Sequence, residues 1–260
     1  MKSSRRQFMK LAAASALGLG AGKLAFMGDA PAFASDIPTA ATFEHPLKAK
    51  HWGMVIDTTK FTKELVEKCA HACRKQHNVP VIEGKKEVKW FWGGTFEEAF
   101  PNQIPEYLSE DVEKREIPLL CNHCESPMCV RVCPTQATFQ RADGIVMMDM
   151  HRCIGCRYCM AGCPFGARSF NFQNPRPFIK DEDFNPNYPT RTRGVVEKCT
   201  FCTELLAEGK MPACVEVSEG ALTFGDLGDE NSEIRHLLRE KFTIRRKPDA
   251  GTKPSVYYII

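Results

Sequence analysis

Two cysteine runs constrain this chain more than any other feature of its sequence. The first run has the spacing C-x2-C-x4-C-x3-C-P and comprises Cys121, Cys124, Cys129 and Cys133. The second has the spacing C-x2-C-x2-C-x3-C-P and comprises Cys153, Cys156, Cys159 and Cys163. The second spacing is that of bacterial ferredoxins, in which three cysteines bind one [4Fe–4S] cluster and the fourth binds its neighbour. The sequence therefore predicts iron–sulfur clusters that tie two loops into one fold.

Other uses of cysteine explain less of this pattern. Zinc sites also use C-x2-C pairs, but they close with four ligands and do not need the added C-x3-C-P. Covalently attached haem needs C-x-x-C-H, and no histidine follows any of the C-x2-C pairs. Zinc and disulfides stay open as alternatives to iron–sulfur binding.

Residues 1–34 have the pattern of an export signal. The stretch SRRQFMK at 4–10 resembles a twin-arginine signal, and a short apolar stretch at 11–22 follows it. A retained membrane anchor is the alternative, but the apolar stretch is shorter than the roughly 20 residues that a span needs. We therefore expect a signal peptide at 1–34 and a periplasmic domain at 35–260. The twin-arginine route implies a protein folded around its cofactors before export, which favours clusters over disulfides.

The charge of the chain gives no sign of a nucleic-acid partner. The segment 1–34 carries five cations and one anion, so the remainder has a net charge of −1 although the whole chain has +3. That balance offers no basic patch for nucleic acid or for an anionic membrane surface. The sequence also lacks a nucleophile–base arrangement and a phosphate-binding glycine loop. We expect no catalytic residues, and hence an electron-transfer protein with no substrate site of its own.

Local patterns predict short strands around the cysteine runs. Strands are expected at 51–57, 86–92, 116–120 and 255–260. Residues 137–149 predict a hairpin that turns at 142–144, and 233–241 predict a late helix. A further helical segment is expected between Cys202 and Cys214, and the segment 172–190 is expected to be a surface insertion.

The sequence resembles the iron–sulfur subunits of exported or membrane-associated respiratory complexes, the electron-transfer partners of dimethyl sulfoxide reductase-like enzymes. The resemblance covers nearly all of 51–260 and lies in CNHCESPMCVRVCPTQATF, GIVMMDMHRCIGCRYCMAGCPFGARSF, VEKCTFC and TKPSVYYI. It implies an α+β fold of duplicated bacterial ferredoxin-like modules with loop-rich insertions. One half would lie around 115–171, and the other would combine 51–80 with 195–225.

The resemblance also implies which cysteines bind which cluster. Family members carry four cysteine motifs, and the second exchanges its fourth cysteine with the third, as the first does with the last. Cluster A would be held by Cys121, Cys124, Cys129 and Cys163. Cluster B would be held by Cys153, Cys156, Cys159 and Cys133. Cluster C would be held by Cys199, Cys202, Cys214 and Cys73.

A fourth cluster is not expected, because three of its four ligands are missing. Of the positions that match the family's motif, only Cys69 is a cysteine; the others fall near Phe61, in 64–66 and at Ser218. Apolar residues at every fourth position from Phe61 to Cys73 predict a helix that fills this volume instead. We expect three [4Fe–4S] clusters, with a degenerate fourth cluster bound in part by Ser218 as the alternative.

Several other residues near the cysteine runs give weaker signals. We expect His123 and His151 to be packed or hydrogen-bonded rather than bound to metal. The tryptophans are expected in the core or at an interface. Four arginines either raise cluster potentials or lie in ordinary surface ion pairs: Arg131, Arg152, Arg157 and Arg168.

The resemblance implies an exported subunit that passes single electrons through its clusters. It is most similar to the periplasmic iron–sulfur subunit of the transmembrane complex associated with dissimilatory sulfite reductase. By that resemblance its partners would be a polytopic quinone-interacting membrane subunit and a multihaem cytochrome c or other redox subunit, with membrane association through these partners only. The alternatives are a subunit of a molybdopterin reductase or a nitrite-reducing system, a zinc- or disulfide-stabilised scaffold, and a stand-alone ferredoxin.

Overall fold

The computed structural model describes residues 45–260, and the predicted signal peptide at 1–34 lies outside this range. Four strands form one sheet: β1 (Trp52–Asp57), β8 (Leu222–Asp226), β9 (Thr243–Ile244) and β10 (Val256–Ile259). Six others form three two-stranded sheets: β2 (Phe91–Gly94) with β3 (Ile117–Leu120), β4 (Thr138–Gln140) with β5 (Val146–Met148), and β6 (Ser169–Phe170) with β7 (Val196–Glu197). The α+β prediction is confirmed as a small mixed α/β fold, whereas the duplication of ferredoxin-like modules stays a prediction.

Within residues 45–260, two helices are longer than five residues, α2 (Lys63–His77) and α9 (Glu233–Glu240). The short helices are α3 (Phe96–Ala99), α4 (Glu110–Glu113), α5 (Met128–Arg131), α6 (Tyr158–Ala161), α7 (Thr203–Ala207) and α8 (Ala213–Glu216). Single 3-10 turns complete the described part: η1 (Thr58–Lys60), η2 (Gly84–Lys86), η3 (Arg176–Phe178), η4 (Asp181–Asp183) and η5 (Pro248–Ala250).

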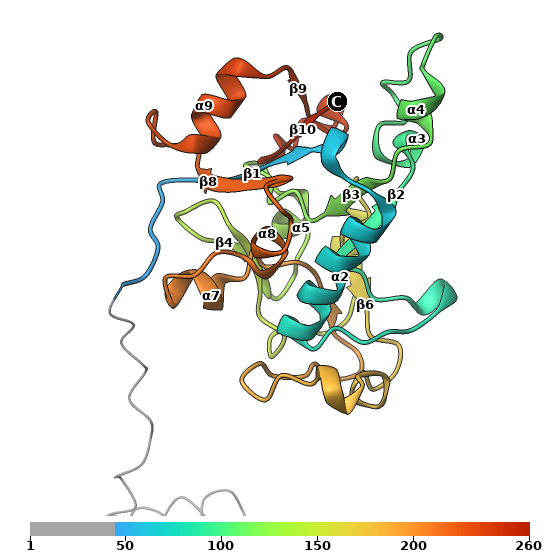
Figure 1. The fold of residues 1–260 in the computed structure, drawn as a ribbon. Coiled ribbons are helices and arrows are strands. Elements are labelled where there is room, and N and C mark those ends of the chain that lie inside the picture. The colour runs from blue at the N-terminus through green and yellow to red at the C-terminus, as the bar shows by residue number, and fades with distance from the viewer. Residues whose placement is uncertain (1–44) are drawn as a thin grey trace, which may run out of the picture. The chain divides into compact units, whose positions relative to one another are not determined.

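The four-stranded sheet has the order β8-β1-β10-β9 (Figure 1). β1 pairs antiparallel with β8 and parallel with β10, so the C-terminal strand lies between β1 and β9. Met54 and Ile56 of β1 pack in the main core, whereas Val55 packs with Ile234 of α9. Both faces of β1 are therefore covered, which explains why its apolar sequence is uninterrupted.

The helix α2 carries Cys73 toward the other cysteines. It begins after Thr62, whose side-chain oxygen accepts a hydrogen bond from the Leu65 amide at 3.2 Å. It ends at Asn78, which adopts the left-handed conformation with φ 53°. The buried face consists of Val66, Cys69, Ala70, Cys73 and His77. The predicted helix is confirmed, except that Phe61 precedes its N-cap and is buried from outside the helix.

Most of the other predicted elements are confirmed. The hairpin at 137–149 is β4 and β5, and its turn contains Gly144, whose φ of 83° suits glycine. The strands at 51–57, 116–120 and 255–260 are β1, β3 and β10, and the helix at 233–241 is α9. The strand expected at 86–92 is wrong in its bounds, because β2 begins only at Phe91 and Lys86 ends the η2 turn. The insertion at 172–190 contains only two 3-10 turns.

The cysteine runs repeat one local structure. Cys129, Cys159 and Cys214 each occupy the second position of a four-residue helix, in α5, α6 and α8. Each is the third cysteine of its run as the sequence orders them. Each of these short helices therefore presents the third cysteine of its run in the same local setting.

Candidate iron–sulfur sites

The first predicted set of cysteines surrounds one cavity. Cys121, Cys124, Cys129 and Cys163 all line it. Cys121 follows β3, Cys129 lies in α5 and Cys163 follows α6, so both runs contribute. Burial raises the pKa of the Cys124 thiol to about 12, and the thiol of Cys121 adds to that rise. The fold therefore brings Cys163 of the second run to the three thiols of the first run.

The second predicted set surrounds a separate cavity. Cys133, Cys153, Cys156 and Cys159 all line it, the first from the earlier run and the other three from the later one. Cys156 is exposed to solvent, whereas Cys159 is buried. Ile154 and Tyr158 beside it are exposed apolar side chains, at 67% and 63%. This set is therefore the most accessible of the three.

The third predicted set is completely buried. It consists of Cys73, Cys199, Cys202 and Cys214. Burial raises the pKa of Cys73 well above its ordinary value, and the thiols of Cys199 and Cys214 raise it further. The pKa of Cys202 is raised by burial and then by Cys214 and Cys73. Cys73, Cys199 and Cys214 pack in the same core, and His77, which lies 3.7 Å from Cys73 Sγ, groups with Cys202.

The first set adjoins both of the others. Burial raises the pKa of Cys199 in the third set to about 12, and Cys121 of the first set is the next largest cause. Burial also raises the pKa of Cys159 in the second set, and Cys129 of the first set contributes to that rise. The packing agrees, because Cys121 shares one core with Cys199, and Cys129 shares another with Cys159.

The donor chemistry of these sets fits [4Fe–4S] clusters. Each set offers four sulfur atoms, which suit iron–sulfur clusters and not the hard cations that prefer oxygen. The raised thiol pKa values indicate environments that disfavour an uncompensated thiolate. Bound iron would supply the compensating positive charge and deprotonate the thiols. The assignment of each cysteine to its cluster stays a prediction.

The position of the expected missing cluster is filled by packed side chains. Phe61 is 6% exposed and Cys69 is 0% exposed. The Cys69 thiol donates to the Cys214 carbonyl at 3.5 Å, and burial raises its pKa to about 11. The Ser218 hydroxyl donates to the Val215 carbonyl at 2.8 Å and accepts from the Leu222 amide at 3.2 Å. Both polar groups that remain at this position are thus hydrogen-bonded to the main chain.

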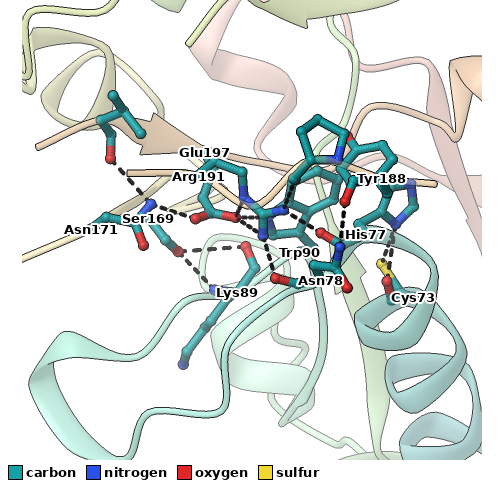
Figure 2. Close-up of polar contacts among 12 residues, drawn as sticks. Cys73, His77, Asn78, Lys89, Trp90, Ser169, Asn171, Tyr188, Arg191 and Glu197 are labelled. Carbon is teal, nitrogen blue, oxygen red and sulfur yellow. Dashed lines mark hydrogen bonds and ion pairs between the residues drawn. The ribbon is translucent and has the colours of Figure 1, made fainter. Parts of the chain in front are cut away.

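A buried polar network supports the third set, and sequence patterns did not predict it. Glu197 of β7 is 0% exposed and accepts hydrogen bonds from Trp90 Nε1 and Arg191 Nε, both at 2.8 Å (Figure 2). Arg191 also donates to the carbonyl oxygens of His77 and Asn78 at the end of α2. The insertion at 172–190 thus leads into a residue that fixes the C-terminus of the helix carrying Cys73.

His77 connects this network to the sulfur ligands. Its Nδ1 donates to the Cys73 carbonyl at 3.0 Å and lies 3.7 Å from Cys73 Sγ. Its ring packs against Trp90, with centroids 4.6 Å apart (Figure 2). His77 also groups with Cys202 and Glu204 in an arrangement that could hold a metal ion. Its Nε2 lies 2.8 Å from Glu204 Oε1, so the imidazole and the carboxylate face one another.

The weaker sequence signals divide according to burial. His123 is packed, since its ring stacks on that of Phe201 with centroids 3.7 Å apart, and its Nδ1 accepts a hydrogen bond from the Val146 amide at 3.1 Å. His151 is exposed. Trp52 and Trp90 are buried in the core, while Trp92 is half-buried. Of the four arginines only Arg168 is buried.

No helix within residues 45–260 is long and apolar enough to cross a membrane. Residues 112–176, which include both complete cysteine runs, match the family described as 4Fe-4S dicluster domain.

Three relatives resemble most of the chain. The Hdr-like menaquinol oxidoreductase iron-sulfur subunit 1 of Archaeoglobus fulgidus is 41% identical over 98% of this chain and 97% of its own length. The iron-sulfur cluster-binding subunit of menaquinone reductase from Nitratidesulfovibrio vulgaris is 34% identical over 80% of this chain and 79% of its own. The B component of polysulfide reductase from Wolinella succinogenes is 35% identical over 81% of this chain and 95% of its own.

Proposed function

This chain belongs to the family of [4Fe–4S] iron–sulfur subunits of quinol-linked oxidoreductase complexes, and from that premise we propose that it relays single electrons through three clusters. The relay would connect a quinone-reactive membrane subunit to another redox protein. The observation that carries the proposal is the convergence of twelve cysteines as three sets of four, with the first set next to both others. When bound, the clusters supply reversible one-electron chemistry. The protein's own residues hold them and exclude water from the third set.

The proposed number of clusters, three, follows from the number of cysteines. Twelve of the thirteen cysteines form the three sets, and Cys69 alone is left over, whereas a [4Fe–4S] cluster needs four ligands. Phe61 occupies the same region, and the Ser218 hydroxyl is already engaged with the main chain. We therefore favour three clusters held by the predicted sets over a degenerate fourth cluster.

The complex in which this subunit works is a further part of the proposal. We favour a periplasmic complex associated with dissimilatory sulfite reductase, with a polytopic quinone-interacting subunit and a multihaem cytochrome c as partners. The twin-arginine pattern at 4–10 supports export. The likeness to a menaquinol oxidoreductase subunit supports a quinone-linked partner. The likeness to the polysulfide reductase component supports the second candidate, a subunit serving a molybdopterin reductase.

Iron and acid-labile sulfide, measured per chain on protein purified without oxygen, test the cluster number. We expect about twelve of each. Cys69→Ser should leave these contents unchanged, whereas Cys202→Ser should lower iron because it removes a ligand of the third set. A content near sixteen would overturn the three-cluster proposal. Abundant zinc without sulfide would overturn electron transfer altogether.

The proposed location and partners need a separate measurement. Purification of the native complex from membranes should recover the chain with a haem-containing subunit and a polytopic subunit. Cell fractionation should find it on the periplasmic side of the cytoplasmic membrane. Recovery as a free monomer from the soluble fraction would favour a stand-alone ferredoxin. Recovery with a molybdopterin-containing subunit would favour the second candidate.

A further inference from the structure

Arg168 is a buried cation with no carboxylate partner among the described residues. It follows the second cysteine run, just before β6, and is 5% exposed. Its Nη1 donates to Thr138 Oγ1 at 3.1 Å and lies 3.7 Å from Met148 Sδ. Its Nη2 is buried and has no nitrogen or oxygen partner in the described part of the chain. An isolated buried charge is costly, so some other group must compensate this guanidinium.

Arg168 lies beside the cavities of two different cysteine sets. Its side chain lines the cavity of the first set together with Cys121 and Cys129. Its Nη1 contacts Met148, which lines the cavity of the second set. Although burial disfavours the charged form, the thiolates of Cys129, Cys159 and Cys121 raise the pKa of Arg168. The guanidinium is therefore placed between the two sulfur sets.

We propose that Arg168 is a positioning residue that lies between clusters A and B and raises the reduction potentials of both relative to cluster C. This inference rests on the proposed cluster sites. Reduction adds negative charge to a cluster, so a fixed cation beside it favours the reduced form. A guanidinium is always charged in a protein, so this cation is permanent. Its burial keeps salt from screening the effect.

Redox titrations monitored by electron paramagnetic resonance test this role. In Arg168→Gln the reduction equilibria of two clusters should become less favourable by about tenfold, which corresponds to about 59 mV for one electron. The third cluster should keep its potential, because the third set does not contact this arginine. Arg168→Lys retains the charge but not the fork of donors, so its shifts should be smaller. The matched control is Arg152→Gln, which removes the charge of an exposed arginine next to Cys153.

The outcomes separate this inference from the proposed function. Wild-type protein with about twelve iron, together with unchanged potentials in Arg168→Gln, would overturn the role of Arg168 and leave the three clusters intact. Equal shifts of all three clusters would also overturn it. If Arg168→Gln does not assemble, Arg168→Met, which also removes the charge, carries the test, and a full iron content with unchanged potentials of clusters A and B would refute the role of Arg168. A wild-type iron content far from twelve would instead refute the cluster sites on which the inference rests.

Discussion

Replacing Glu197 by alanine should destabilise this fold far more than removing a surface carboxylate. The side chains of Arg191 and Glu197 are 3% and 0% exposed, and Arg191 Nη2 lies 2.6 Å from Glu197 Oε2. In the variant the guanidinium would stay buried with no carboxylate to oppose its charge. Trp90 Nε1 and Asn171 Nδ2 would lose the same acceptor. Three buried donors therefore depend on one side chain.

The expected cost follows from the burial of this pair. Removing one partner of a buried ion pair costs about 3–5 kcal/mol, because the remaining charge is left without compensation. The lower end of that range corresponds to about a hundredfold change in the folding equilibrium. The loss of acceptors for Trp90 and Asn171 adds to the cost, since an unsatisfied buried donor is itself unfavourable.

The assay is the rate at which the visible absorbance of the clusters disappears in a fixed concentration of guanidinium. Glu197→Ala should bleach at least tenfold faster than wild type if most of the cost appears in the unfolding rate. The matched control is Glu110→Ala, which removes a carboxylate from the exposed pair with Lys114 and should change the rate little. Combining Glu197→Ala with Arg191→Met should recover part of the loss, because no unpaired charge remains. A Glu197→Ala rate equal to that of the control would refute the reasoning.

Two further changes test other parts of the structure. Burial opposes ionisation of Asp226, but hydrogen bonds from the Lys50, His51 and Gly228 amides hold its pKa below the ordinary value. Asp226→Asn should therefore unfold faster than wild type at neutral pH. The difference between the two unfolding rates should narrow only as the pH falls below about 3.8. A difference in unfolding rate that widens in acid would contradict this. Ser218→Cys should leave the iron content at about twelve per chain, because Phe61 and Cys69 fill the region; four additional iron atoms would show that the site can be restored.

Elements whose folding depends on local pattern could be predicted from the sequence. The strand β1 is a short, uninterrupted apolar run, and the hairpin of β4 and β5 turns at a glycine with positive φ. The helix α9 follows from its apolar periodicity. In each case the sequence pattern that predicts the element lies within one short segment of the chain.

The predictions failed where a neighbour outside the segment decides the structure. The expected strand at 86–92 combines apolar residues with a polar start, and only its end pairs with β3. Phe61 fits the helical spacing of Cys69 and Cys73, but the cap formed by Thr62 starts α2 after it. The sheet order β8-β1-β10-β9 joins the two ends of the described chain, and no local pattern specifies such a pairing.

The candidate sites show the same division between local spacing and long-range placement. The spacing of the two complete runs identified eight of the cysteines, whereas the third set and the assignment of all twelve cysteines to clusters came from the family resemblance. The network of Glu197 and Arg191 had no signal in the sequence, because its members are separated from Trp90 and His77 by about a hundred residues. Single charged residues carry no periodic pattern from which their burial could be inferred.

The arginines around the cysteine runs illustrate why burial decides what a charge can do. Arg131, Arg152 and Arg157 are exposed, and Arg152 already pairs with Asp149 at 3.2 Å. Water and salt screen such charges, so their effect on a nearby cluster is small. Arg168 has the same side chain and is farther in sequence from a cysteine, yet it lines the cavity of the first set, contacts Met148 of the second cavity and is buried from solvent. The low local dielectric strengthens the interaction of the Arg168 charge with its neighbours. Arg168 differs from the other three arginines because the hairpin and the loop around it enclose its side chain.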